Sequence, residues 1–485
     1  MGVTLKIINN FNSAVTKCTD YFGHHFTDDQ VWLFFLNTSG KITYTDATSS
    51  TTKTVQDASS VQLSTVKNGT FSLATGENST KLFAGFGTDK TSPFSGNDGP
   101  GSFDKDVPYV LAEWTISGDT SDNVDISYID SFSFPTVATI KDGSGTETGK
   151  SGFKAGTKAL DVITLLEGRM TPEPAGPNNS QKPTAGQVGY GPEVPTISDD
   201  ATAKRWIGSS KFYTSGPDST NKRSMYIYAP TFHNYLKYLQ DNEPTTTTNS
   251  GSIKGWYIDY SGNDGYSGYL SITGSESAGY GLEVHDIRVN TKPSAVNDWE
   301  AQPNAGTATT GKITVVANNT SLTYPPVPTD TVDGFWTDAV IYSGAALLGT
   351  IGGGPIVIGS GDFATNGAHS VIVATFLASI SASIATGLLG STMYVNALNS
   401  TTATSKGTMY WFNKLTRADS LTQLFDKAWP NGEEYYDPFW AVLEEATDNQ
   451  GYLSPFNDRW SNFSPDLSLG TDSTIEWELG LKSTT

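Results

Sequence analysis

The chain has 485 residues and a net charge of −20; 36% of its residues are hydrophobic and 16% are charged. This length predicts two to three domains, and the charge argues against nucleic acid or an anionic membrane as a partner, because phosphate would be repelled. The single cysteine, Cys18, excludes an internal disulfide framework, so a hydrophobic core must hold the fold together.

Residues 1–140 are predicted to form strands throughout. Alternating or clustered β-forming residues recur between short Gly, Asn, Asp and Ser turns, which is typical of a sandwich or barrel. The first residues alternate like a strand and have no basic region before an apolar stretch, so no cleavable signal is expected and the compartment stays open. The predicted strands are VTLKIINN, DQVWLFFLN, KITYTD, SVQLSTV, TFSLA, KLFAGFG, PYVLAEWTI and NVDISYIDSFSF.

The middle of the chain changes character twice. Residues 141–225 are rich in Gly, Pro, Ser and Thr and are interpreted as an insertion or linker, with one short helix at ALDVITLLEGR. Residues 226–334 are predicted to be a mixed β region, in which TFHNYLKYLQD forms a short helix. The overall prediction is therefore a mainly β protein with a second α/β domain.

The second domain is predicted at 335–449, where the apolar pattern becomes helical. Residues 370–389 carry no charge over a length that could span a membrane. They lack flanking Lys or Arg and an aromatic belt, which favours a buried helix over a membrane or pore segment. Two amphipathic helices follow, at SLTQLFDKAW and DPFWAVLEEAT, and residues from about 450 to 485 return to strand and are expected to complete the first domain.

The segment 109–135 contains the most informative pair of carboxylates. If Asp119–Asp122 form a four-residue loop between two strands, Glu113 lies opposite Tyr128 and diagonal to Asp130. Diagonal positions are roughly 7–8 Å apart, within the ~6.5–9.5 Å carboxyl separation of inverting glycosidases. A two-residue slip of one strand would open the gap to about 13 Å and remove the argument.

The same segment resembles the thaumatin family. LAEWTI followed by DNVDISYIDSFSFP is similar to that family's E-F-T strand and V-D-x-F-x-x-P segment, and VTLKIINN is similar to its first strand. DPFWAVLEEATDNQGYLSPFNDRW resembles the helix and YPFDD-like strand of glycoside hydrolase family 64, and AHSVIVATFLASISASIATGLL occupies the place of that family's central helix. The resemblance implies a thaumatin-like sandwich and a helical α/β domain on either side of a groove.

Family 64 enzymes are inverting β-1,3-glucanases that act on laminarin-like glucans and need no cofactor. By resemblance, Glu113 is the general acid, Asp130 the general base and Asp125 an acid lining the cleft, and an extracellular location is favoured. Asp458 aligns with a terminal acidic pair of which this chain has one member. The departures are the missing disulfides, Lys81 where an arginine is expected, and residues 141–225, which have no counterpart.

Aromatic residues among glycines in GWYIDYSGNDGYSGY suggest a sugar-binding surface, formed chiefly by Trp256, Tyr257 and Tyr260. Tyr128, predicted opposite Glu113, is also expected to bind substrate. The histidines, cysteine and glycine-rich segments match no metal, nucleotide or nucleophile motif. The leading hypothesis is therefore an endo-acting hydrolase of β-1,3-glucan. The alternatives are a non-catalytic glucan-binding or antifungal protein, and a toxin or assembly protein; the oligomeric state is left open.

Overall fold

The structure is a computed structural model of the full chain. It describes residues 2–87, 94, 108–128, 131–169, 191–193, 205–207, 233–248, 251–261, 265–275, 279–290, 307–315, 357–361, 379–399, 406–414, 435–447, 451–453 and 467–482.

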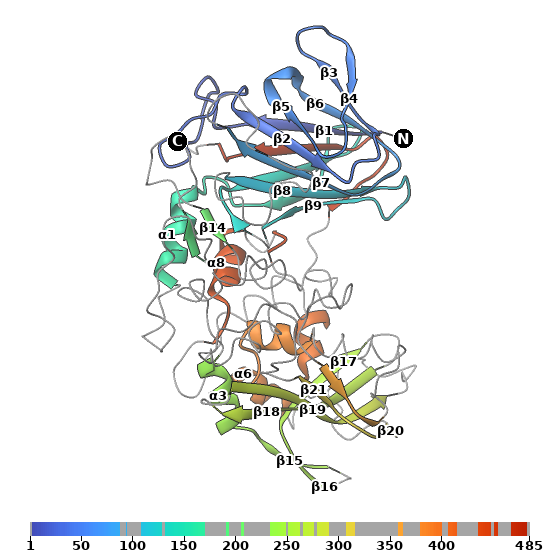
Figure 1. Ribbon diagram of the computed structural model, residues 1–485, viewed down its shortest axis with the longest axis vertical. Coiled ribbons are helices and arrows are strands. Elements are labelled where there is room, and N and C mark those ends of the chain that lie inside the picture. The colour runs from blue at the N-terminus through green and yellow to red at the C-terminus, as the bar shows by residue number, and fades with distance from the viewer. Residues whose placement is uncertain are drawn as a thin grey trace.

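The N-terminal part forms a β-sandwich, which lies at one end of the molecule (Figure 1). One sheet has the order β12-β11-β24-β1-β6-β3-β4, and the facing sheet has the order β23-β9-β8-β7-β2-β5. The strands of the first sheet are β12 (Glu147–Gly152), β11 (Thr136–Lys141), β24 (Thr474–Leu479), β1 (Gly2–Asn9), β6 (Val66–Ala74), β3 (Ile42–Asp46) and β4 (Thr52–Thr54). Those of the second are β23 (Leu467–Ser468), β9 (Asn123–Ser127), β8 (Tyr109–Ile116), β7 (Glu77–Phe86), β2 (Val31–Leu36) and β5 (Ser59–Gln62), which leads into the 3-10 helix η1 (Leu63–Thr65).

Alternation of apolar and polar residues creates the core between these sheets. In β1 every second residue is buried, so Val3, Leu5 and Ile7 point inward while Lys6 points outward. Phe35 of one sheet packs against Phe71 of the other at 5.4 Å between ring centroids. The mainly β prediction is therefore confirmed.

The two ends of the described chain meet in one sheet. Strand β24 lies between β1 and β11, parallel to β1, with Lys6 opposite Glu476. No strand was predicted at the start of residues 141–225, but β12 lies there and pairs with β11 in a hairpin. The Asp142 carboxylate accepts hydrogen bonds from the backbone N–H groups of Ser144 and Thr146 and thereby builds the turn.

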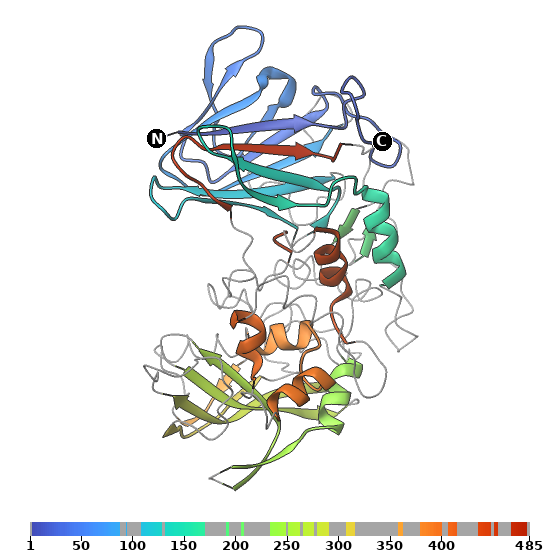
Figure 2. The same ribbon diagram turned by 180° about the vertical axis from the view of Figure 1, so that it is seen from behind.

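A second lobe occupies the other end of the molecule (Figures 1 and 2). Its main sheet has the order β17-β18-β19-β21-β22, with β20 also pairing with β19. The helix predicted at 231–241 is present as α3 from His233 onward and packs on β18. The elements are α3 (His233–Asp241), β15 (Thr245–Thr248), β16 (Gly251–Lys254), β17 (Trp256–Ser261), β18 (Gly265–Ser275), β19 (Gly279–Asn290), β20 (Thr307–Ala308), β21 (Ile313–Val315), β22 (Val357–Gly359), α6 (Thr392–Leu398) and the π-helix η5 (Tyr410–Lys414).

The uncharged segment at 370–389 is described from Ser379 onward, where residues 379–385 are helical. Ile380, Ile384 and Leu388 are fully buried in the protein core, as a buried helix requires. Among the residues that the structure describes, no helix has the length and apolar character needed to cross a membrane.

Two further helices lie beside the sandwich, on the side turned toward the second lobe (Figure 2). The predicted helices at ALDVITLLEGR and DPFWAVLEEAT are α1 (Ala159–Arg169) and α8 (Pro438–Thr447), and they contact each other. A small sheet is formed by β10 (Ser131–Phe132), β14 (Arg205–Ile207) and β13 (Gly191–Glu193). The predicted helix at SLTQLFDKAW lies outside the described residues, and the predicted domain boundaries stay predictions.

Candidate functional site

Glu113 lies on the outer face of the sandwich, on a central strand of its sheet. Its neighbours Ala112 and Trp114 point into the core and are almost fully buried, whereas the Glu113 side chain is 31% exposed. Strands β8 and β9 lie on the side of the sandwich turned toward the second lobe (Figure 1). A carboxylate held by a paired central strand is a well-positioned group for chemistry on this face.

A row of charged side chains crosses three strands here. Lys81 of β7 is opposite Glu113 of β8, and Glu113 is opposite Asp125 of β9. The Lys81 Nζ lies 3.5 Å from the Glu113 Oε2. Opposite residues of an antiparallel pair have Cβ atoms about 4.5–5.5 Å apart and share one face, so Glu113 stands between one positive and one negative neighbour.

The predicted register between β8 and β9 was wrong by three residues. Thr115 pairs with Asn123, so the connection is longer than the four residues assumed. The Asp122 carboxylate accepts hydrogen bonds from Ser117 N at 2.7 Å and Gly118 N at 3.0 Å, which holds both residues in the turn and out of the ladder. Gly118 has φ +93°, a conformation that suits glycine.

Tyr128 consequently does not face Glu113. It is 1% exposed, its hydroxyl accepts a hydrogen bond from Thr136 N at 3.0 Å, and its ring packs edge-on against Phe153. Burial raises the pKa of this phenol far above its usual range. Its predicted role in substrate binding is therefore corrected to one in the core.

The three other acids predicted for the site are not all described. Asp125 lies on the outer face beside Glu113. Asp130 and Asp458 lie outside the described residues, and the register correction removes the diagonal argument that placed Asp130 near Glu113. The pairing of Glu113 with Asp125 was missed because it depends on the length of the turn, which residue types alone did not fix.

An apolar cluster adjoins the charged row on the same face. Phe34, Phe83 and Leu111 form the next cross-strand row, and Tyr109 and the half-buried Trp32 follow. Phe34, Phe83 and Tyr109 are 2%, 8% and 4% exposed, and Phe94 packs against Phe34 at 5.7 Å between ring centroids, so these rings form a small core of their own and not an open surface for a sugar.

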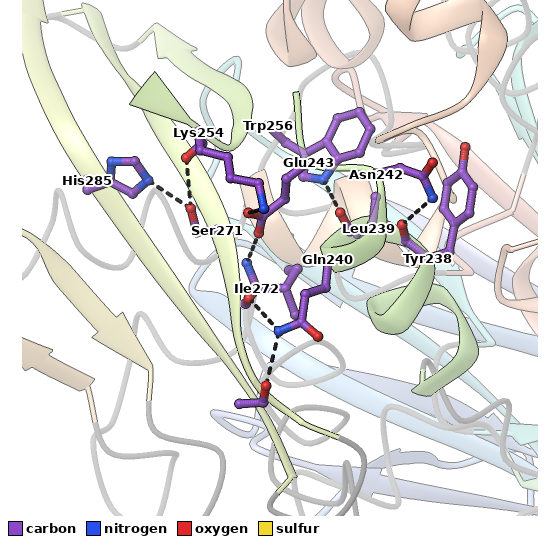
Figure 3. Close-up of polar contacts among 11 residues, drawn as sticks. Tyr238, Leu239, Gln240, Asn242, Glu243, Lys254, Trp256, Ser271, Ile272 and His285 are labelled. Atoms are coloured by element: carbon purple, nitrogen blue, oxygen red, sulfur yellow. Dashed lines mark hydrogen bonds and ion pairs between the residues drawn. The ribbon is translucent and has the colours of Figure 1, made fainter. Parts of the chain in front are cut away.

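The aromatic residues predicted to bind sugar in the second lobe are mostly buried. Trp256 and Tyr257 are 4% and 3% exposed, and the Trp256 Nε1 donates to the Leu239 carbonyl at 3.0 Å (Figure 3). The prediction that these two rings are exposed was wrong, because α3 covers Trp256. Tyr260 pairs with Tyr266 between β17 and β18, and its side chain is outside the described residues.

A serine and a histidine meet on β18 and β19 of the second lobe (Figure 3). The Ser271 Oγ is 2.8 Å from the His285 Nε2 and 3.0 Å from the Lys254 carbonyl, to which it donates. Because a hydroxyl has one proton to donate, His285 then donates to Ser271 and does not accept its proton. This arrangement does not activate a nucleophile.

Side chains also complete an exposed part of β18 (Figure 3). The Glu243 Oε1 accepts a hydrogen bond from Ile272 N at 2.6 Å, and Gln240 Nε2 donates to the carbonyls of Ile272 and Gly274. β17 pairs with β18 only as far as Leu270, so these side chains take the place of a neighbouring strand for the backbone of Ile272 and Gly274. The contacts therefore stabilise the fold.

One buried carboxylate in the second lobe has an unusual environment. Asp259 is 7% exposed, and burial raises its pKa to about 6 despite hydrogen bonds from Met409 N and the Thr408 hydroxyl. A Cβ on Gly407 would lie 2.2 Å from the Asp259 carboxylate, so a glycine is required there. Through these contacts Asp259 joins β17 to the segment before η5.

The described part of the chain contains no group of three or more His, Cys, Asp or Glu side chains that could hold a metal ion.

Comparisons with known proteins give only distant likenesses. No family model and no curated protein matches the sequence. The chain is similar to the crystal structure of a β-1,3-glucanase domain of glycoside hydrolase family 64 from Clostridium beijerinckii, with 13% identity and a TM-score of 0.45 over 99% of this chain and 98% of that one. It is also similar to a laminaripentaose-producing β-1,3-glucanase in complex with laminaritetraose, with 11% identity and a TM-score of 0.46 over 99% of each chain.

A third likeness is to the family 64 laminaripentaose-producing β-1,3-glucanase from Paenibacillus barengoltzii, with 14% identity and a TM-score of 0.23 over 34% of this chain and 43% of that one. At these TM-scores the likenesses do not place the chain in the family. The function is therefore argued from the residues.

Proposed function

We propose that this chain is a glycoside hydrolase that cleaves β-1,3-glucan on the outer face of β8 and β9. The observation that carries the proposal is Glu113: a half-buried carboxylate on a central strand, facing outward beside Asp125. The resemblance of this segment to the thaumatin family and to glycoside hydrolase family 64 supplies the substrate class.

In the proposed reaction Glu113 is the general acid. It donates its proton to the glycosidic oxygen as the bond from that oxygen to the anomeric carbon breaks. A water molecule attacks the anomeric carbon from the opposite face and loses its proton to a general base, so the configuration is inverted. Tyr128, Trp256 and Tyr257 have no part in the proposal, because all three are buried.

The proposed base is Asp130, on the resemblance, and Asp125 is proposed to bind substrate. An inverting pair needs carboxyl groups ~6.5–9.5 Å apart to leave room for the water. Asp125 lies directly opposite Glu113, where Cβ atoms are only about 5 Å apart, so it fits that requirement poorly. Asp125 instead adds negative charge beside Glu113, which favours the protonated form that an acid needs.

A non-catalytic glucan-binding protein is the second candidate, and the Lys81 contact favours it. An ammonium 3.5 Å from Glu113 favours the ionised carboxylate, which cannot donate a proton. A reducing-sugar assay on laminarin separates the two functions, because the binding protein releases no new reducing ends.

Exogenous azide tests the proposed base. Asp130→Ala should lose turnover by several orders of magnitude, and azide should restore part of it by replacing the activated water. The product should be a glycosyl azide of inverted configuration. Full turnover of Asp130→Ala without azide would remove Asp130 from the mechanism.

A further inference from the structure

Lys81 is the cation that the described structure places against Glu113. The two residues are cross-strand partners on β7 and β8, and their charged groups are 3.5 Å apart. The preceding strand in the sheet, β2, places the apolar Leu36 opposite Lys81. The sheet therefore presents an ammonium to one side of Glu113 and a carboxylate to the other.

The charged neighbours of Glu113 on the packed strands are thus Lys81 from β7 and Asp125 from β9. On its own strand, the residues two positions away on the same face are Leu111 and Thr115, which carry no charge. Lys81 favours the ionised form of Glu113 and Asp125 the protonated form. These two neighbours therefore act on the protonation of Glu113 in opposite directions.

We propose that Lys81 is a positioning residue that orients the Glu113 carboxylate and sets the upper pH limit of the activity. The inference rests on the proposed function, in which Glu113 must carry a proton to act. An ammonium beside it makes that proton leave at a lower pH. The alkaline side of the pH profile therefore depends on Lys81, and a purely structural lysine would not affect it.

The chain offers a matched control in the other sheet of the sandwich. Lys6 and Glu476 are also cross-strand partners on an outer face, 3.2 Å apart, with side chains 42% and 20% exposed. The corresponding values for Lys81 and Glu113 are 37% and 31%. Glu476 also pairs with Lys141 and so keeps one cation in Lys6→Met, but a general effect of removing an exposed lysine from an outer-face ion pair should be the same at both sites.

The first test is the pH dependence of kcat/KM on laminarin for the wild-type protein, Lys81→Met, Lys81→Arg and Lys6→Met. Lys81→Met should move the alkaline limb upward by about half a pH unit, which is the size expected of a partly exposed pair. Lys81→Arg should restore the wild-type limb, and Lys6→Met should leave it unchanged. The inference would be overturned if the alkaline limb of the kcat/KM profile stayed at the same pH in Lys81→Met, or if it moved equally far in Lys6→Met.

The second test does not need activity and so separates the inference from the proposed function. The Glu113 carboxyl carbon can be followed by ¹³C NMR in protein labelled at glutamate, with Glu113→Gln for assignment. Its titration midpoint should rise by about half a pH unit in Lys81→Met. If the Glu113 midpoint rises in Lys81→Met but the wild-type protein does not hydrolyse glucan, the proposed function is rejected while the effect of Lys81 on Glu113 stands. An unchanged midpoint in folded Lys81→Met and in Lys81→Gln would reject the contact itself.

Discussion

The buried Asp259 should make the stability of the protein fall as the pH rises. Burial raises its pKa from the usual 3.8 to about 6, so the folded protein holds this proton more tightly than the unfolded chain. The stabilisation is complete below pH 3.8 and is lost as the pH rises through about 6. A pKa shift of about two units, at roughly 1.4 kcal/mol per unit, changes the free energy of unfolding by about 3 kcal/mol in total. Of this change, between about 2 and 3 kcal/mol occurs between pH 4 and 7.5.

Asp259→Asn removes this titration and leaves one carbonyl oxygen to accept from Thr408 and Met409. The free energy of unfolding should be measured in urea at both pH values. From pH 4 to 7.5 the wild-type protein should lose about 2 kcal/mol relative to the variant. The exposed Asp241→Asn is the control and should parallel the wild type. If the unfolding free energy of Asp259→Asn also changed with pH in parallel with that of the wild type, the pH dependence would not come from Asp259.

Three further predictions concern named side chains. Glu77→Ala should lower the free energy of unfolding by about 2–4 kcal/mol in urea titration, because its buried carboxylate accepts hydrogen bonds from five donors that would lose their partner. Gly407→Ala should lower the free energy of unfolding by about 1–3 kcal/mol in the same assay, because its Cβ would meet the Asp259 carboxylate. An unfolding free energy equal to that of the wild type would contradict this packing. Asp125→Asn should weaken laminarin binding less than tenfold in calorimetry and keep turnover measurable in the reducing-sugar assay. Asp130→Asn should abolish turnover and keep laminarin binding. The reverse pattern would exchange the roles proposed for the two acids.

The burial of Glu77 illustrates why the direction of a pKa shift depends on the partners. Burial alone would raise the pKa of this carboxyl, but hydrogen bonds from Thr80, Ser39 and Lys41 outweigh it and the pKa is lowered. Its stabilisation is therefore present above the usual carboxyl pKa and is lost as the pH falls through the lowered value. The pKa of Asp259 shifts in the opposite direction because its hydrogen bonds do not compensate for its burial.

The strands of the sandwich were predictable from the sequence because their pattern is local. β1 and β24 alternate apolar and polar residues, and this alternation alone determines which residues enter the core. β12 was missed because it is an exposed edge strand of Gly, Ser, Thr and charged residues, which have no apolar alternation.

The site was only partly predictable because it depends on register. Glu113 was selected correctly as an outward residue of β8, but its partner depended on the Asp122 turn, a hydrogen-bonding arrangement that residue types did not reveal. Trp256 was expected at the surface because glycines surround it in sequence. It is buried by α3, which is adjacent in the fold but was not predicted to pack there.

Release of reducing ends from laminarin by the wild-type protein and by Glu113→Gln tests the central claim most directly. The glutamine has the size of the glutamate but no acidic proton, so kcat should fall by a factor of about 10² or more while laminarin binding is retained. Wild-type hydrolysis together with that loss is the predicted result. Unchanged turnover in Glu113→Gln, or no hydrolysis by the wild-type protein that binds laminarin, would contradict the proposal.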